Sequence, residues 1–391
     1  MRQALPRPPR LEAANVAAFR FRRLDGRYLV TDELGRCRFL TPQAFRRLVA
    51  GAPPAGLARR RLRLERLASS WRRRQRLPWS GPGRHVVIVA DGAARMTIET
   101  ARSVVDTILE SPNPELAVEL RGAALKASRP VVSFLTAYAR RKSRLADKRL
   151  RLFLDAPPGS AGGAAAPAVT RRALSRARET VERCFRRGSA GIRLKPLDPP
   201  GRARPSRRRI GYTPQEFLRF YAEALGRVLE LNERRRFYEE TARGFLAKIL
   251  LGRAPERCGL NSPCGAATAR LAYDCDGGVY PCEEGLRLGR AGDETFRLAR
   301  AGGGAYESAV GHAAVRAMAV ASCLDNQPCC SQCAYQPYCG VCPIQCYAEQ
   351  GDIMGRMPTN SRCLINQGIL DLLMRKLRER ASRRILRSWL S

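Results

Sequence analysis

The stretch CCSQCAYQPYCGVCPIQC, residues 329–346, decides the fold of the last third of this chain. It places six cysteines within eighteen residues. The C-x2-C pairs Cys330–Cys333 and Cys339–Cys342 let two thiolates from one turn reach the same metal, while distant cysteines complete its coordination. Thiolate is a soft ligand that suits zinc and iron–sulfur clusters. The stretch therefore predicts a cysteine-ligated metal domain.

The other cysteines gather around this stretch. The chain has 14 cysteines, and only Cys37 and Cys184 precede the segment from Cys258 to Cys363. The basic N-terminus lacks the apolar run of a secretory signal, and no stretch of about 18 apolar residues predicts a membrane span. We therefore expect a cytoplasmic, reduced protein, in which clustered cysteines indicate metal binding rather than disulfides. Spacing alone leaves iron–sulfur clusters and two four-cysteine zinc sites both open.

Four more cysteines lie just upstream of the dense stretch or inside a predicted hairpin. Cys258 and Cys264 have five residues between them. The segment AYDCDGGVYPC, residues 272–282, predicts a hairpin with Asp-Gly-Gly at its turn, which delivers Cys282 on the returning strand. Cys275 lies within that hairpin and is not needed as a ligand.

The net charge of +36 points to anionic partners. A basic surface attracts nucleic-acid phosphate, and it equally attracts an acidic protein or peptide. The sequence has neither the spacing of a C2H2 zinc finger nor an aromatic-rich basic strand for base stacking. Nucleic-acid binding is therefore disfavoured, although a zinc-stabilised, arginine-rich nucleic-acid-binding protein stays open as an alternative.

The front of the chain predicts a disordered basic lead over residues 1–15 and a small α+β unit over residues 16–78. Within FRFRRLDGRYLVTDELGRCRFLTP, residues 19–42, three short strands are separated by turns at Asp25-Gly26 and Leu34-Gly35. Thr41 and Pro42 then supply the N-cap and first position of a helix. A second helical stretch is expected over residues 57–76.

Residues 80–198 alternate strand-like and helix-like segments, which favours parallel βαβ units. Strands are expected at 84–90, 116–120, 150–154 and 191–194, helices at 97–110, 131–141 and 169–187, and a flexible low-complexity connection at 160–167. The remaining predicted parts are a Pro/Arg linker (199–211), a helical connection (212–255), the cysteine domain (258–366) and a basic C-terminal helix (367–391). In the helical connection, Thr213 and Glu216 form a capping box, and a break is expected near Asn232.

The order C-x5-C, G-x4-C, C-x2-C-x5-C and a final C resembles the SPASM domain, the C-terminal extension of radical SAM peptide maturases. The segments GRYLVTDELGRCRFLTP, IGYTPQEFLRFYAEAL, LAYDCDGGVYPCEEG and CAYQPYCGVCPIQCYAEQGDI resemble the radical SAM maturases of His-Xaa-Ser peptide systems. The resemblance implies an α/β fold. It would be a truncated partial (β/α) barrel of the radical SAM type, with a small N-terminal α+β unit and a C-terminal cysteine-rich SPASM-like domain.

In that family, eight SPASM cysteines hold two auxiliary 4Fe–4S clusters. Carried over by position, the first cluster would be held by Cys258, Cys264, Cys282 and Cys342, and the second by Cys330, Cys333, Cys339 and Cys363. The family commonly leaves three residues between the last two cysteines of the dense run, where this chain leaves two. Cys346 is therefore an alternate for Cys342, and Cys329 is an alternate for Cys330.

Features of a radical SAM active site are missing from the sequence. Such a site needs a C-x3-C-x2-C loop after the first barrel strand, but strand 84–90 is followed by DGAAR and then MTIETA, without a cysteine. Residues 121–125, RGAAL, stand where the family carries a Gly-Gly-Glu-Pro type motif. Four strand candidates replace the six of the family's partial barrel. The resemblance is thus to a degenerate member with a shortened barrel, and no bound SAM is expected.

No alternative set of catalytic residues replaces the missing loop. The two histidines, His85 and His312, fall in apolar strand and helix contexts typical of structural residues, and Asp155 at a strand end has no partner carboxylate. We therefore assign no catalytic residue and expect no independent radical SAM activity.

The sequence predicts a non-catalytic or electron-relay partner in the maturation of a ribosomally made peptide (a RiPP). Its partners would be the precursor peptide, an active radical SAM maturase, or both, and no membrane. The front unit weakly resembles a peptide-recognition element that adds its ligand as a strand to a sheet edge, and a plain structural cap is the alternative. A redox or peptide-modifying enzyme that uses an auxiliary cluster is the alternative function.

Overall fold

The computed structural model describes residues 19–33, 35–50, 81–122, 128–154, 164–197, 211–253 and 258–391. It is a mixed α/β structure. The predicted lead at 1–15, the helix at 57–76 and the linker at 199–211, except its last residue, lie outside the described residues. No helix within these ranges is long and apolar enough to cross a membrane.

The N-terminal unit is a three-stranded antiparallel meander with one helix, as predicted. Its elements are β1 (Phe19–Leu24), β2 (Arg27–Asp32), β3 (Cys37–Leu40) and α1 (Pro42–Val49). Asp25 and Gly26 both have positive φ at the β1–β2 turn, which the Asp-Gly pair tolerates at low cost. The Thr41 hydroxyl accepts a hydrogen bond from the Ala44 amide, so the predicted N-cap of α1 is confirmed.

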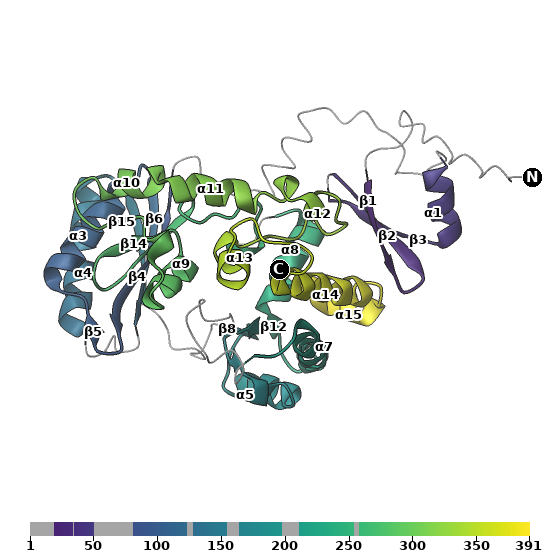
Figure 1. Cartoon of the computed structure of the whole chain (residues 1–391). Coiled ribbons are helices and arrows are strands. Elements are labelled where there is room, and N and C mark those ends of the chain that lie inside the picture. The colour runs from purple at the N-terminus through teal and green to yellow at the C-terminus, as the bar shows by residue number, and fades with distance from the viewer. Residues whose placement is uncertain are drawn as a thin grey trace, which may run out of the picture.

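The largest sheet contains the three long predicted strands of the middle region. The strands β4 (Arg84–Asp91), β6 (Glu115–Gly122) and β7 (Arg149–Leu154) run parallel. On the other side of β4 the sheet continues with β13 (Arg270–Tyr273), β14 (Gly278–Tyr280) and β15 (Ala299–Arg300). The helices α3 (Ile98–Leu109) and α4 (Arg129–Leu145) lie together on one face (Figure 1).

A second set of short parallel strands consists of β8 (Ala164–Ala165), β10 (Gly191–Ile192) and β12 (Tyr238–Glu239). The predicted strand at 191–194 is confirmed in part. The prediction of only four strands before the linker is wrong, because β8 falls in the run interpreted as a flexible connection. Beyond the linker, β12 falls in the predicted helical region. Two-residue strands carry no periodicity, so they are set by pairing with β10 rather than by local sequence.

Two sets of three parallel strands, β4–β6–β7 and β8–β10–β12, thus alternate with helices along the described chain. The strand β13 also runs parallel to β4, and β9 (Ala168–Val169) pairs parallel with β11 (Lys195–Pro196). No described residue pairs β7 with β8, so the two sets form separate sheets. The predicted partial barrel, as one continuous sheet, is not confirmed.

The predicted helix at 169–187 is shorter than expected. The chain first forms β9 (Ala168–Val169), which pairs with β11 (Lys195–Pro196), and then a 3-10 turn over Arg171–Ala173. The helix α5 covers only Ala177–Arg186. Pairing between β9 and β11 therefore overrides the local helical tendency.

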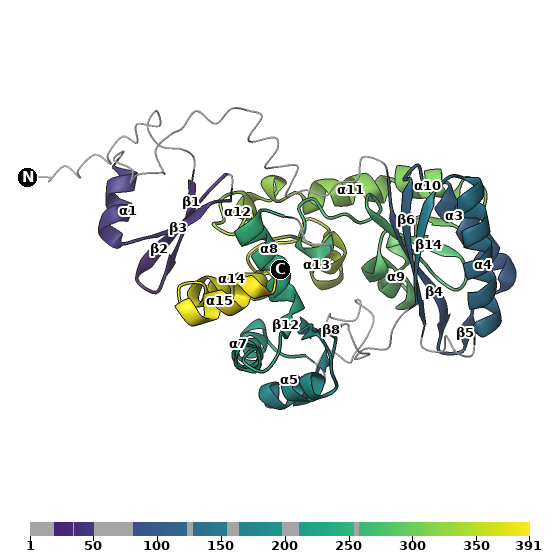
Figure 2. The same ribbon diagram turned by 180° about the vertical axis from the view of Figure 1, so that it is seen from behind.

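The helices that follow the linker form the largest hydrophobic core. The capping box of α7 (Pro214–Leu231) is present as predicted, with the Thr213 and Glu216 side chains bonding each other's backbone. The predicted break occurs at Asn232, whose side-chain amide donates to the carbonyls of Val228 and Phe237 at 2.7 Å each. After α8 (Glu240–Leu251), this core is completed by α14 (Ser361–Lys376) and α15 (Arg380–Ser388), and both views place α14 beside α7 (Figures 1 and 2).

The boundary predicted between cysteine domain and C-terminal helix falls inside one helix. The helix α14 begins at Ser361, so Cys363 lies in its first turn, and the chain turns again before α15. The ring nitrogen of Trp389 donates to Asn232 at 3.1 Å, which fastens the C-terminal helix to the break after α7.

Candidate metal centre

The cysteine region lies between the large sheet and the N-terminal unit, as Figure 1 shows for α12 (Pro328–Ser331), α13 (Pro343–Gln350) and α14. The hairpin β13–β14 forms as predicted and leads into α9 (Glu283–Arg290). The short helix α12 and the loops around it bring cysteines from distant parts of the sequence into this region.

The structure brings together the four cysteines predicted to hold the second cluster. Cys330 lies in α12, Cys333 and Cys339 in the turns that follow, and Cys363 in the first turn of α14. Burial raises the pKa of Cys330, and the nearby thiols of Cys339, Cys363, Cys333 and the alternate Cys329 raise it further. Burial is the largest cause for each, and it raises the pKa of Cys363 to about 12.

Several amide groups face the sulfurs of this set. The side-chain amide of Asn366 donates to Cys339 Sγ at 3.6 Å, and that of Gln367 donates to Cys363 Sγ at 3.5 Å. The backbone amide of Tyr335 donates to Cys333 Sγ at 3.5 Å. Hydrogen bonds of this kind stabilise thiolate ligands and tune the clusters they hold.

Two of the four cysteines predicted for the first cluster lie at helix N-termini. Cys282 is the N-cap of α9 and Cys342 is the N-cap of α13, so the positive ends of two helix dipoles point at this pair. Burial raises the pKa of Cys342, with Cys282 the next cause and Glu284 after it. Cys264 is buried in the same hydrophobic cluster. The side chain of Cys258 lies outside the described part of the chain.

The two alternate ligands occupy different surroundings. Cys346 is buried, and its sulfur faces Gly355 and accepts a hydrogen bond from the Asn360 side chain at 3.8 Å. Burial raises the pKa of Cys346 to about 12. Cys329 is exposed.

Cys275 stays in the hairpin beside Asp274. Burial raises its pKa, with Asp274 the next cause. None of the causes is another cysteine.

The donor set of the second group fits an iron–sulfur cluster. Four half-buried thiols, three of them with amide donors, are stable together as thiolates only where a cation compensates their mutual repulsion. Among the described residues, no three His, Cys, Asp or Glu side chains already stand in metal-binding geometry. The thiols therefore lie near one another without forming a tetrahedral set of ligands. Metal binding would require their side chains to turn toward a shared centre.

The connection after β4 is a tight turn. The strand β5 (Ala94–Arg95) folds back onto β4, pairing Ala90 with Arg95, and α3 begins directly after its N-cap Thr97. Gly122 at the end of β6 lies against this turn: a Cβ there would stand 2.5 Å from the Ala90 carbonyl oxygen.

Ion pairs bridge the carboxyl ends of the neighbouring strands. Arg290 on α9 pairs with Asp91 at 2.5 Å and also with Asp274, while Arg121 pairs with Glu283 and with Glu119. Sequence reasoning did not identify these charges as neighbours, because no local motif links residues so far apart. They occupy the edge where a radical SAM site would be sought.

Both histidines have structural roles. His85 is fully buried and bonds the Tyr273 hydroxyl and the Pro82 carbonyl at 3.2 Å each. Burial lowers the pKa of His85 to about 4, so its ring is neutral at neutral pH. His312 was expected within a helix, but it lies between two helices and caps α11 (Ala313–Ser322). Asp155 lies outside the described residues.

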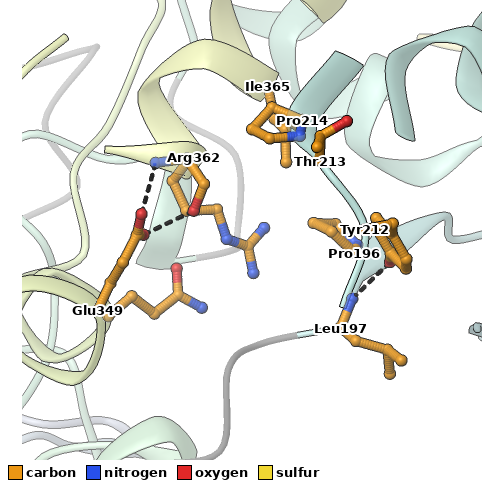
Figure 3. Close-up of a pocket in the computed structure, with 10 residues that line it drawn as sticks. Pro196, Leu197, Tyr212, Thr213, Pro214, Glu349, Arg362 and Ile365 are labelled. Carbon is orange, nitrogen blue, oxygen red and sulfur yellow. Dashed lines mark hydrogen bonds between the residues drawn. The ribbon is translucent and has the colours of Figure 1, made fainter. Parts of the chain in front are cut away.

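A small pocket opens beside the cysteine region, between the start of α7 and helices α13 and α14 (Figure 3). The Glu349 carboxylate there accepts hydrogen bonds from the backbone and hydroxyl of Ser361, and Tyr212 accepts one from the Leu197 amide. The cavity volume is about 50 Å³. Small-molecule sites usually measure roughly 300–1,000 Å³, so this pocket suits a side chain rather than a nucleoside.

No family model and no curated protein matches the sequence. Among solved structures, anSMEcpe with bound AdoMet and the Cp18Cys peptide has a TM-score of 0.60 and 14% identity, covering 77% of this chain and 100% of that chain. The same enzyme with bound AdoMet has a TM-score of 0.59 and 14% identity, with 76% and 99% covered. The chain shares their fold. anSMEcpe is an anaerobic sulfatase-maturating radical SAM/SPASM enzyme, so the expected likeness to this class of enzyme holds at the level of the fold.

Proposed function

We propose that this protein binds two 4Fe–4S clusters and serves as a non-catalytic or electron-relay partner in the cytoplasmic maturation of a ribosomally made peptide. Cys258, Cys264, Cys282 and Cys342 would hold one cluster, and Cys330, Cys333, Cys339 and Cys363 the other. The observation that carries the proposal is the gathering of four half-buried thiols in the second set, three of which accept hydrogen bonds from amides.

The neighbours of Cys342 and Cys346 support one choice of ligand at the first site. Cys342 lies beside Cys282, whereas Cys346 packs against Gly355 and bonds Asn360. We therefore favour Cys342 over Cys346. We favour Cys330 over the exposed Cys329 for the second site, because cluster ligands are better shielded from solvent.

A peptide partner is supported by the fold and by the N-terminal unit. The solved neighbour was crystallised with a peptide. In this chain, β1 is an edge strand that pairs only with β2 among the described residues. It carries Phe21, which is 52% exposed beside the rings of Tyr28 and Phe45. An extended peptide that adds to this edge would cover that aromatic surface.

The proposal that the protein does not itself cleave SAM rests on the connection after β4. A loop that binds the SAM cluster needs three cysteines, and this turn contains none before α3 begins. The degenerate relationship to maturases of His-Xaa-Ser systems belongs to this proposal, since it rests on the quoted sequence resemblance.

Two measurements on anaerobically reconstituted protein test the proposed role. With SAM and dithionite, the protein alone should form no 5′-deoxyadenosine. We expect a short precursor gene next to its own, and the protein should bind the peptide that this gene encodes. Formation of 5′-deoxyadenosine by the pure protein would refute the non-catalytic role. SAM-independent modification of the peptide, abolished in Cys282→Ala, would instead establish an enzyme that uses its auxiliary cluster.

A further inference from the structure

The C-terminal helix α15 has one basic face and one apolar face. At about 100° per residue, positions 380, 383, 384 and 387 fall within an arc of about 100°. The arginines at these four positions are all exposed, whereas Leu386 and Trp389 on the opposite side are fully buried. The helix therefore presents a row of arginines to solvent while its other side packs into the core.

The positive charges around this helix are paired only in part. From Arg375 to the last residue, seven basic side chains accompany one acidic side chain, that of Glu379. The Glu379 carboxylate pairs with Lys376 at 3.0 Å, and Arg383 donates from Nε to the Leu377 carbonyl at 2.6 Å. Within the described part of the chain, no group pairs with the guanidinium groups of the other three arginines of the row, which we call the arginine face: Arg380, Arg384 and Arg387.

The arginine face is held in place although its charges repel one another. Arg384 stands four residues after Arg380 and three before Arg387, and like charges at these spacings destabilise a helix. The end of the helix is nevertheless fixed, because Arg236 donates to the Trp389 carbonyl at 3.0 Å. An anionic partner would therefore relieve the repulsion without having to order the helix.

The arginine face begins beside the N-terminal unit. Asp25, in the turn between β1 and β2, pairs with Arg375 at 3.0 Å and with Arg378 at 3.9 Å. Arg378 also lies over the ring of Phe39 on β3, 5.1 Å from its centroid. Both views accordingly show α15 close to the hairpin of β1 and β2 (Figures 1 and 2). A peptide that adds to β1 and continues past Leu24 would therefore reach the arginine face.

We propose that the arginine face binds an acidic segment of the precursor peptide, adjacent to the segment that adds to β1. Arg380 and Arg387 lie about 10 Å apart along the helix axis. In an extended peptide, every second side chain points the same way, at intervals of about 7 Å. Acidic residues at alternate positions can therefore meet the row, and each guanidinium can hold a carboxylate through two parallel hydrogen bonds. The inference rests on the function proposed above and specifies the peptide that the protein recognises.

A peptide fits this face better than a nucleic acid does. Proteins that bind single strands combine basic grooves with aromatic side chains on which the bases stack. Trp389, the aromatic residue at the end of α15, is fully buried and offers no stacking surface. The neighbouring strand edge of the N-terminal unit instead suits a polypeptide backbone.

The test is fluorescence anisotropy with the reconstituted full-length protein and a short labelled peptide in which glutamate alternates with serine. The triple variant Arg380→Gln/Arg384→Gln/Arg387→Gln should bind this peptide about tenfold more weakly at low salt. Lysine at the same three positions keeps the charge and should retain most of the affinity. Because the glutamine variant relieves repulsion, its unfolding temperature should be unchanged or higher, so weaker binding would not reflect a lost fold.

The triple variant Arg140→Gln/Arg141→Gln/Arg144→Gln is the matched control. These are exposed arginines of α4, on the far side of the large sheet from α15 (Figures 1 and 2). Equal affinity of the two glutamine variants for the peptide would overturn the inference. Tighter binding of duplex DNA or RNA than of the peptide, lost in the α15 variant, would overturn it in favour of a nucleic acid. Protein that takes up no iron would instead overturn the function on which the inference rests.

Discussion

Replacement of Lys248 by methionine tests how the cysteine region is anchored to the helical core. The ammonium group donates to the Leu260 carbonyl at 2.7 Å and to the Cys339 carbonyl at 2.8 Å, which joins α8 to two cysteine-bearing loops. Hydrogen bonds from a charged group contribute about 1.5–3 kcal/mol each, so the loss of two amounts to about 3–6 kcal/mol. Methionine keeps the apolar stem and relieves the cost of burying a charge. We expect a net loss of about 2–3 kcal/mol.

The loss of stability should be confined to the loops that Lys248 anchors. Since 1.4 kcal/mol changes an opening equilibrium tenfold, amide hydrogen exchange should become about 30–150 times faster around residues 258–264 and 336–342. Hydrogen exchange followed by mass spectrometry measures this directly. Lys142→Met is the control, because Lys142 is an exposed residue that pairs with Asp106 at 3.4 Å. Unchanged exchange in Lys248→Met would refute the anchoring role, and a uniform rise across the whole chain would show global rather than local destabilisation.

Three further outcomes follow from the contacts described above. Cys342→Ala should lose about half of the bound iron while Cys346→Ala retains it, and the reverse result in an iron assay would exchange their roles. The buried, neutral His85 has its pKa lowered to about 4, so the unfolded chain binds the extra proton as pH falls below about 6.5. Stability should therefore be fully present above about pH 6.5 and decline by about 3 kcal/mol toward pH 4, and denaturation of His85→Gln, which lacks the ring, should lose that pH dependence. Thr213→Ala removes the N-cap of α7 and should cost about 1 kcal/mol in the same assay, whereas an unchanged midpoint would show that the cap adds nothing.

Elements with their own local signals could be predicted from the sequence. Thr41 and Thr213 mark the starts of helices, because their hydroxyls accept hydrogen bonds from backbone amides in the first turn. Strand β4 is a buried apolar run, and the Asp-Gly pair marks the first hairpin. Cys330, Cys333 and Cys339 lie close together because short loops join them, whereas the inclusion of Cys363 in the second set came from the family resemblance.

Features that depend on distant pairing could not be predicted. The strand Ala164–Ala165 exists only because β10 lies beside it, and alanine pairs carry no strand signal. Arg20 meets Ser331 across 311 residues of sequence, and Arg290 meets Asp91 across 199. Such contacts arise when whole helices and strands pack together, so no local sequence pattern predicts them.

The most direct test of the account is the metal content of the full-length protein after anaerobic purification and reconstitution. Two four-iron clusters predict roughly eight irons and eight sulfides per chain. Cys363→Ala and Cys282→Ala should each reduce this to about half. Stoichiometric zinc with no iron, or iron that is unaffected by both substitutions, would contradict the account.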